Sequence, residues 1–382
     1  MDAFEPMLGD SSSRPRGEGP TAGPAKPVPW ETAAMPEAAL RVLMLTPSYL
    51  PRSGGVERHV RCVSRELLAR GVEVRVATPR WDAAWPVQES AEGVEVIRLS
   101  RSRAAGMREL TPHVDWAEVV HTHDAYPFLK YYLPHRLRRP RRPVFATFHG
   151  YEGYPIPLEA KALRRIVLWL TWGSLCAGAF IPKWYRFRCA HVTHGGVDAP
   201  EARPPLGDGA VFVGRLEPDT GFLGYVEALG RLKEAHGIDL PLGVCGDGSL
   251  REAGETAARE RGLNVTFHGR VPDATPYLSR ARFACVSGLL AMLEAMAAGA
   301  IVLALYDNPL KEDYLRLFPG AGHLVIAGSP GELADRAAEL VGHPELQEAI
   351  AAEAFEFARA QTWGKVADLY LQLWAAGGVR QP

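Results

Sequence analysis

The sequence contains few cysteines, and they follow no recognisable spacing. Five cysteines are scattered through 382 residues, mostly in apolar surroundings, and no C-x-x-C or Cys/His ligand pattern accompanies them. An odd number of thiols without paired spacing argues against a disulfide scaffold and against a structural zinc site. We therefore expect free, buried thiols in a protein of a reducing compartment.

An excess of charge of either sign is also lacking. The chain has 43 Lys and Arg against 44 Asp and Glu, which leaves a formal net charge of −1. This balance gives no basis for an extended nucleic-acid surface, so we expect no nucleic-acid partner.

No segment of the sequence resembles a secretory signal or a membrane span. The first forty residues have no apolar core of the signal-peptide type. The most apolar run, residues 166–182, is shorter than the roughly 20 residues that a spanning helix needs, and Gly173 and Gly178 interrupt it. The run therefore predicts a buried core helix, and the sequence as a whole predicts a cytoplasmic protein.

Two common phosphate and metal motifs are absent as well. The sequence has no Asp-x-Asp pair and no G-x-G-x-x-G loop. His121 and His123 in HTHD are of the residue type that binds metal, but no third ligand stands at a suitable spacing. We expect neither a metal site nor a bound cofactor.

What the sequence does contain is a repeated alternation of strands and helices. Hydrophobic residues make up 47% of it, and its length favours two domains. We predict a disordered tail rich in Pro, Gly and Ser, two α/β halves of strand–helix–strand units, a linker between them and a last helix that packs back across the seam. The predicted segments are residues 1–39 (tail), 40–200 (first half), 201–209 (linker), 210–358 (second half) and 359–382 (last helix).

In the first half, polar and glycine-rich segments follow several buried strands. Gly54 and Gly55 precede a helix, where they either allow a ligand to approach backbone N–H groups or simply form a turn. His149 follows a strand directly and either contacts a phosphate or sugar or bonds within its own loop. The basic run at residues 135–142 is read as a solvated loop and helix end, with weak contact to an anionic membrane or a phosphate surface as the alternative.

The second half places candidate ligand-binding residues at the same positions relative to its strands. Arg215 ends one strand and offers a bidentate donor, unless Glu217 pairs with it. Gly246 and Asp247 form a turn after the next strand. Glu294 stands alone in the apolar stretch VSGLLAMLEAMAAGAIVLA, where burial is costly without a hydrogen-bond partner. It is either a solvated helix residue or the group that binds a ligand hydroxyl.

At this point six ordered segments resemble a known family. PSYLPRSGGVERHV, THGGVD, AVFVGRLEPDTG, VCGDGSLRE, VTFHGRV and LEAMAAGAIVLA resemble segments of the retaining glycosyltransferases of family 4, in the same order and spacing. The resemblance extends from about Leu40 to Trp374. It implies the GT-B fold, in which two facing Rossmann-like, doubly wound parallel-sheet domains enclose a cleft.

The resemblance also assigns roles to individual positions. It implies that Gly54 and Gly55 lie near the donor diphosphate and that His149 lies beside the transferred sugar. It further implies that Arg215 binds the diphosphate and that Glu294, as the second glutamate of the E-x7-E motif, takes the ribose hydroxyls. Together with Gly246 and Asp247 these form the expected donor site, with His149 and Arg215 as its catalytic residues.

Two positions depart from the family pattern. Val286 stands where the first glutamate of E-x7-E is expected, and Thr220 stands where a lysine usually accompanies the arginine. Loss of a cation beside a developing phosphate charge is costly unless another replaces it. Lys311 and Lys183 are the two candidates for that replacement.

The sequence thus predicts a metal-independent transferase that moves a sugar from a nucleotide diphosphate to an acceptor hydroxyl with retention of configuration. The acceptor class stays open among a glycan, a lipid-linked acceptor and a small molecule. The alternative, which Val286 and Thr220 favour, is a non-catalytic relative that binds a nucleotide sugar or a partner protein. The five retained residues Gly54, Gly55, His149, Arg215 and Glu294 favour the transferase.

Overall fold

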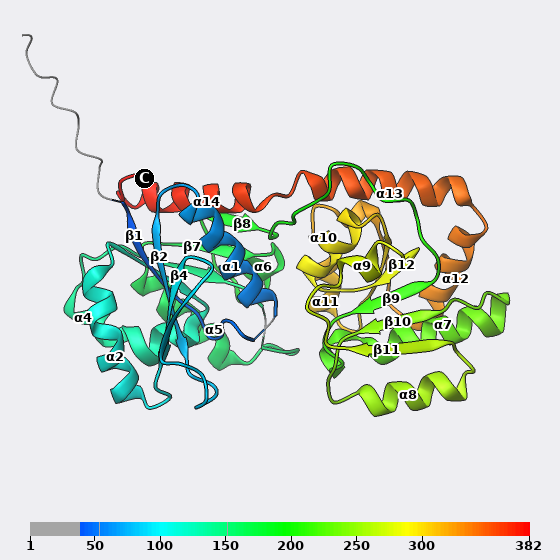
Figure 1. Cartoon of the computed structure of the whole chain (residues 1–382), viewed down its shortest axis with the longest axis horizontal. Helices are drawn as coiled ribbons and strands as arrows, with labels where there is room; N and C mark the ends of the chain where they lie inside the picture. The colour runs from blue at the N-terminus through cyan, green and yellow to red at the C-terminus, as the bar shows by residue number, and fades with distance from the viewer. Residues whose placement is uncertain (1–38, 53, 151) are drawn as a thin grey trace, which may run out of the picture. The chain divides into compact units, whose positions relative to one another are not determined.

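The computed structural model describes residues 39–52, 54–150 and 152–382. Apart from Ala39, the disordered tail expected at residues 1–39 lies outside these described residues. The described chain forms two parallel α/β halves, each built on its own sheet (Figure 1).

The first sheet orders its strands β3-β4-β2-β1-β5-β6-β7-β8, and every neighbouring pair is parallel except β3 with β4. Its strands are β1 (Arg41–Leu45), β2 (Glu73–Pro79), β3 (Gln88–Ala91), β4 (Val94–Leu99), β5 (Val119–His123), β6 (Val144–Phe148), β7 (Gly173–Ala177) and β8 (His191–Thr193). Its helices are α1 (Gly55–Leu68), α2 (Arg103–Trp116), α3 (Ala125–Pro127), the π-helix η1 (Phe128–Tyr132), α4 (Leu133–Arg138), α5 (Leu158–Leu170) and α6 (Phe180–Tyr185).

The second sheet is parallel throughout, in the order β11-β10-β9-β12-β13-β14. Its strands are β9 (Ala210–Val213), β10 (Leu242–Cys245), β11 (Val265–Gly269), β12 (Phe283–Cys285), β13 (Ile301–Leu305) and β14 (Leu324–Ala327). Its helices are α7 (Phe222–His236), α8 (Arg251–Glu260), α9 (Thr275–Leu278), α10 (Leu289–Ala297), α11 (Pro309–Arg316), α12 (Pro330–Val341) and α13 (Pro344–Arg359), with 3₁₀ turns η2 (Pro218–Thr220) and η3 (Ala321–His323).

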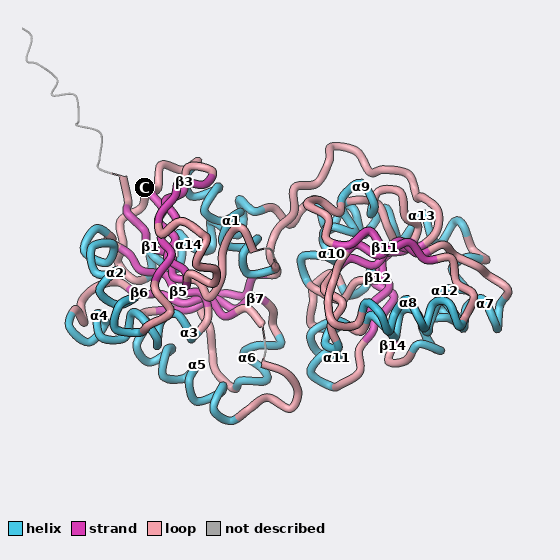
Figure 2. The backbone as a smooth tube through the Cα atoms, turned by 60° about the horizontal axis from the view of Figure 1, so that its bottom comes forward, coloured by secondary structure: helices cyan, strands magenta, loops and turns pink. Residues whose placement is uncertain are grey.

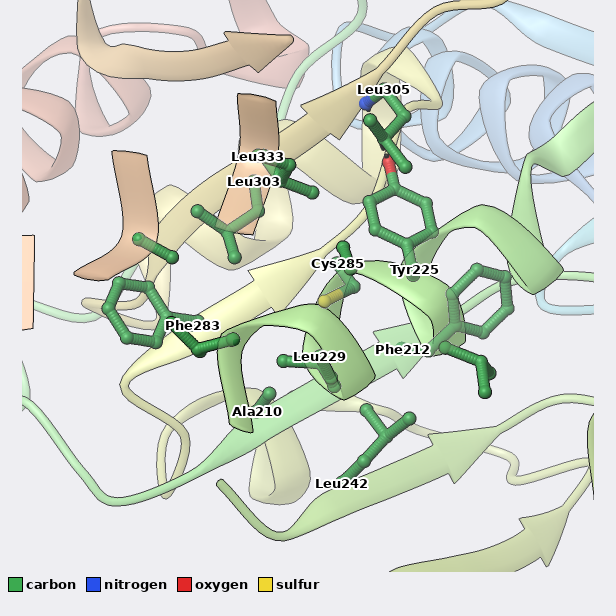
Figure 3. Close-up of a cluster of buried hydrophobic side chains, with 14 of the residues drawn as sticks. Ala210, Phe212, Tyr225, Leu229, Leu242, Phe283, Cys285, Leu303, Leu305 and Leu333 are labelled. Carbon is green, nitrogen blue, oxygen red and sulfur yellow. Dashed lines mark hydrogen bonds between the residues drawn. The ribbon is translucent and has the colours of Figure 1, made fainter. Parts of the chain in front are cut away.

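Both sheets are covered on both faces, as Figure 2 shows with strands in magenta and helices in cyan. Alternate strand residues belong to different hydrophobic clusters, because successive side chains of a strand point to opposite faces. In β9, for example, Phe212 belongs to one cluster and Val211 to another. Figure 3 shows the first of these, in which the Tyr225 hydroxyl accepts the backbone N–H of Leu305 at 3.0 Å. The two largely parallel sheets, each with helices on both faces, confirm the predicted doubly wound architecture.

The two C-terminal helices serve different sheets. Ala354 and Ala358 of α13 pack in a cluster with second-sheet strands and α10. After a short break, α14 (Trp363–Ala376) buries Trp363, Tyr370 and Trp374 in a cluster with first-sheet strands and α1. The chain therefore returns to its first half after completing the second.

The prediction of a buried core helix at residues 166–182 is wrong. The run divides into the end of α5, strand β7 and the start of α6: the backbone turns extended at Thr171, with φ −111° and ψ 156°, and Gly178, with φ +120°, separates β7 from α6. The end of α5 is buried on one side alone, since Val167 is 0% exposed and Trp169 is 84% exposed. In the part of the chain that the structure describes, no helix combines the length and apolarity needed to cross a bilayer.

Candidate active site

The reversal of strand order places a switch point in each sheet. In the first sheet, β2 and β5 lie on either side of β1, and in the second, β10 and β12 lie on either side of β9. In doubly wound sheets, ligands bind beyond the carboxyl ends of the strands at this point. The segments that follow these strands contain Gly54 and Gly55, Asp124, Arg215 and Ser287.

Gly54 and Gly55 form the amino-terminal end of α1. Gly54 has extended backbone, with φ −176° and ψ −179°, and Gly55 begins the helix. Among the described residues, a methyl group added to Gly55 would meet no atom within 4 Å, so packing against them does not require a glycine there. The free N–H groups and the positive dipole of this 14-residue helix are suited to an anion.

Glu294 of α10 has the partner that its burial demands. The Arg58 Nη1 atom lies 2.7 Å from the Glu294 Oε1 atom, and the carboxylate side chain is 15% exposed. Burial raises the pKa of Glu294; Arg58 opposes this rise, whereas Asp273 adds to it. Sequence reasoning missed Arg58, although it stands three residues after Gly55 in the singled-out segment.

Arg215 lies in the loop after β9, where its side chain is 66% exposed and pairs with Asp219 through an Nη2–Oδ2 distance of 2.7 Å. Glu217 is not its partner, because Glu217 accepts the backbone N–H of Ser249 at 3.1 Å and its hydroxyl at 2.6 Å. Among the described residues, no hydrogen bond or ion pair joins Arg215 to His149 or Glu294.

The turn that contains Gly246 and Asp247 is fixed against the loop after β9. A Cβ at Gly246 would lie 1.8 Å from the Gly214 carbonyl oxygen, so the two loops pack too closely for any side chain there. The backbone carbonyl of Asp247 accepts the N–H of Leu216 at 3.0 Å. The glycine at 246 therefore has a structural reason that is independent of any ligand.

The two candidate replacement lysines lie in different environments. Lys311 of α11 is buried, and its ammonium group donates to the Ser287 carbonyl oxygen at 2.7 Å. Burial lowers the pKa of Lys311 to about 8, against the opposing effect of Asp219 and Asp307. Lys183, by contrast, is 55% exposed and pairs with Asp313 at 2.6 Å.

Lys311 also lies next to both departures from the family pattern. The Val286 side chain is buried, and the following residue, Ser287, supplies the carbonyl that holds Lys311. The Ser287 hydroxyl in turn donates to the Thr220 carbonyl oxygen at 3.5 Å. The structure thus places the Lys311 ammonium near Thr220, the position where the family pattern has a lysine.

His149, at the end of β6, is buried and held on two sides. Its backbone N–H donates to the Asp124 Oδ1 atom at 3.0 Å, and its Nε2 atom lies 2.9 Å from the Nδ1 atom of His123. Arg164, itself buried, donates to the neighbouring Gly150 carbonyl at 2.6 Å. Burial, reinforced by Arg164, lowers the pKa of His149 to about 3, so the imidazole is neutral.

A chain of hydrogen bonds connects α14 to α1 behind this residue. The Trp374 indole N–H donates to His121 Nδ1 at 3.1 Å, and His121 Nε2 lies 2.8 Å from the Thr147 hydroxyl. That hydroxyl lies 2.9 Å from the Tyr370 oxygen, which lies 2.9 Å from His59 Nε2. Because an indole nitrogen only donates, His121 accepts at Nδ1, so His121 is neutral and donates from Nε2 to the Thr147 hydroxyl.

The histidines form no metal site, although four of them gather here. Both ring nitrogens of His121, and the Nδ1 atom of His123, are hydrogen-bonded to other side chains. The ring of His59 meets that of His149 edge-on, with the ring centroids 4.7 Å apart. Within the described residues, no group of three or more metal-binding side chains is arranged to hold an ion.

Helix α1 connects the two parts of the site. Arg58 reaches Glu294 in the second half, and the next residue, His59, contacts His149 in the first. The structure therefore brings Gly54, Gly55, His149 and Glu294 together around one helix end. Arg215, Gly246 and Asp247 share a second group of loops, and Lys311 lies near it through Ser287 and Thr220.

Comparison with known proteins defines the class. The solved structure of sucrose-phosphate synthase from Thermosynechococcus elongatus superposes with a TM-score of 0.67 at 19% identity, covering 88% of this chain and all of that one. HepE from Anabaena in complex with UDP gives a TM-score of 0.67 at 14% identity, with 88% and 100% covered. The fold is therefore the GT-B fold of sugar transferases, as predicted.

Sequence comparison identifies the family. Residues 53–199 match the model "Glycosyltransferase Family 4" and residues 207–357 match "Glycosyl transferases group 1", so the two models together cover most of the chain. Phosphatidyl-myo-inositol mannosyltransferase from Mycobacterium leprae is 27% identical, with 88% of this chain and 96% of that protein covered. This chain belongs to the family 4, group 1 glycosyltransferases, and its activity is glycosyl transfer.

Proposed function

We propose that the protein transfers a sugar from a nucleotide diphosphate donor to an acceptor hydroxyl, with retention of anomeric configuration and without a metal ion. The observation that carries this proposal is the set of positive groups beyond the strand ends at the two switch points. The set comprises the amino-terminal end of α1, Arg58, Arg215 and Lys311. Such groups stabilise the charge that develops on a leaving diphosphate, which is the task that a metal ion performs in other transferases.

Each site residue then has a role in this reaction. Arg215 and Lys311 neutralise the diphosphate, and the Gly54–Gly55 amides approach it from the helix end. Glu294 accepts hydrogen bonds from the ribose hydroxyls, and Arg58 neutralises the Glu294 carboxylate when no donor is bound. His149 orients the transferred sugar. Lys183 stays in its ion pair with Asp313 and takes no part.

The stereochemistry can be tested without knowing the acceptor. We expect slow transfer of the donor sugar to water, and proton NMR of the freshly released sugar should show the anomer of the donor before mutarotation. The rate should be unchanged by EDTA, because protein cations supply the electrostatic stabilisation. Release of the opposite anomer, or loss of turnover in EDTA that Mg²⁺ restores, would contradict the proposal. The control is Arg215→Ala, which should abolish release.

For the acceptor, we propose a lipid-linked molecule presented at an anionic membrane surface. The relative from M. leprae acts, by its name, on a phosphatidylinositol lipid. Leu158, Ile166 and Trp169 lie on the outer face of α5, and the first and last are 82% and 84% exposed. An exposed apolar face with tryptophan and nearby basic residues favours binding in the plane of a bilayer interface.

The basic run lies beside this face. The Arg136 Nε atom donates to the Leu170 carbonyl oxygen at 2.7 Å, which places residues 135–142 next to the end of α5. Arg138 and Arg141 are exposed, and Arg165 is exposed on α5 itself. Each basic residue near an anionic surface contributes about 1 kcal/mol to membrane binding.

Vesicle flotation tests this surface. We expect the protein to float with phosphatidylglycerol vesicles and not with phosphatidylcholine vesicles, and we expect the double variant Leu158→Ser/Trp169→Ser to lose flotation. Leu346→Ser, which changes an exposed leucine of α13 in the second half, is the matched control and should float normally. Equal flotation of the double variant and the wild type would exclude α5 as the contact.

A further inference from the structure

The contact between His123 and His149 requires one ring to donate and the other to accept. The His123 Nδ1 and His149 Nε2 atoms lie 2.9 Å apart, and the two ring planes are inclined by 25° with their centroids 5.2 Å apart. A neutral imidazole carries one proton, so each ring has one donor and one acceptor nitrogen. Two arrangements satisfy the contact, and they leave the proton on opposite sides of His149.

The far side of His123 decides between the two arrangements. Its Nε2 atom is buried and has no hydrogen-bond partner among the described residues. If His149 donated through Nε2, His123 would carry its own proton on this isolated nitrogen. A buried N–H without an acceptor is rarer in native proteins than a buried acceptor without a donor. The favoured arrangement therefore has His123 donating through Nδ1.

We propose that His123 is a positioning residue that holds His149 as the tautomer protonated on Nδ1. His149 Nε2 accepts the His123 proton, so His149 has a single N–H, at Nδ1, to offer a substrate. His149 then acts as a neutral hydrogen-bond donor to an oxygen of the transferred sugar. This role of His149 rests on the proposed function, whereas the tautomer itself does not.

The neighbouring groups fix the orientation of the His149 ring as well as its proton. Asp124 holds the backbone of His149, and the His59 ring packs edge-on against the imidazole. His59 is in turn held by Tyr370 of α14, whose oxygen lies 2.9 Å from its Nε2 atom. A ring flip of His149 would break the bond to His123 and disturb this packing, so Nδ1 keeps one direction.

Nitrogen-15 NMR of the histidine rings tests the tautomer directly, with or without turnover. In the wild-type protein we expect His149 Nδ1 to have the shift of a protonated nitrogen and Nε2 that of an unprotonated one. His123→Asn places an amide N–H near the former Nδ1 position and should preserve this state. His123→Gln carries its amide nearer the Nε2 position and His123→Leu has no donor, so both should increase the Nε2-protonated form of His149.

The kinetic readout separates this proposal from the proposed function. With the donor and acceptor that the wild type uses, kcat should fall at least tenfold in His123→Leu and recover in His123→Asn, because the donor at His149 Nδ1 is lost and then restored. A wild-type His149 protonated on Nε2, or an unchanged tautomer in a folded His123→Leu protein, would overturn the positioning role. If the wild-type protein has the expected tautomer but the His149→Ala variant keeps full activity, the role given to His149 in transfer is refuted instead.

Discussion

Replacing Lys311 by methionine is expected to lower kcat by about 10²- to 10³-fold, the loss typical of removing one group that stabilises developing charge. Lys311 is the cation that the structure brings next to Thr220, where the family pattern has a lysine. Steady-state kinetics with the identified donor measure the effect. Lys183→Met is the matched control, because that lysine is exposed and pairs with Asp313, and it should leave kcat nearly unchanged.

The loss in the Lys311 variant should not come from unfolding. The ammonium donates to the Ser287 carbonyl and lies 4.3 Å from the centroid of the Tyr314 ring, so loss of these contacts should lower the free energy of unfolding by about 1–3 kcal/mol, offset in part because methionine buries no charge. The pH profile gives a second readout. Since the pKa of Lys311 is about 8, the charge is lost as pH rises through that value, and kcat/KM should fall there. A Lys311→Met enzyme with wild-type kcat would refute the assignment.

Mild acid should destabilise the protein unusually steeply. Burial holds the pKa values of His59, His121 and His123 well below the ordinary value, and that of His149 at about 3. The unfolded chain protonates all four near pH 6.5, whereas the folded protein keeps them neutral. The stability they contribute is therefore present above about pH 6.5 and is lost as pH falls below it.

The expected size of this effect is large. At pH values well below 6.5, each histidine lowers the free energy of unfolding by about 1.4 kcal/mol for each unit by which the pH falls. The four together lower it by about 5 kcal/mol for each unit. This is comparable to the whole stability of many proteins, about 5–15 kcal/mol. Urea unfolding at pH 7, 6 and 5.5 measures the slope.

Two variants control the acid experiment. His123→Asn removes one buried histidine and should lower the proton uptake on unfolding by about one. The matched control is His236→Gln, which changes a partly exposed histidine outside this buried cluster. Uptake of one proton or fewer by the wild type would show that the cluster is already charged, or open to water, in the native state.

The pattern of strands and helices could be predicted because it depends on local periodicity. The helix predicted after Gly54 and Gly55 appears in the structure as α1, and the strands predicted before His149 and Gly246 appear as β6 and β10. The interpretation of residues 166–182 failed because a run of apolar residues does not state which face is buried. Trp169 is an apolar residue of a type common in protein cores, and yet its side chain is exposed.

The partners within the site were beyond local reasoning. Arg58 and Glu294 lie more than two hundred positions apart, so nothing near Glu294 in the sequence indicates its counterion. The same holds for Trp374 and His121, whose bond fixes the tautomer of His121. The choice between Lys311 and Lys183 likewise depends on tertiary contacts, because the sequence does not show which lysine lies near Thr220. The roles assigned to individual site residues remain predictions.

Binding of a nucleotide sugar is the property on which the proposed transferase activity depends. In a thermal-shift panel of nucleoside diphosphates and their sugars, we predict that one nucleotide sugar raises the Tm, because a ligand that binds only the folded state stabilises it. The shift should be smaller in Arg215→Ala and in Glu294→Ala, whose side chains contact the diphosphate and the ribose in this account. If no nucleotide or nucleotide sugar shifts the wild-type Tm, the account is contradicted, and the chain fits a partner-binding relative with a degenerate site.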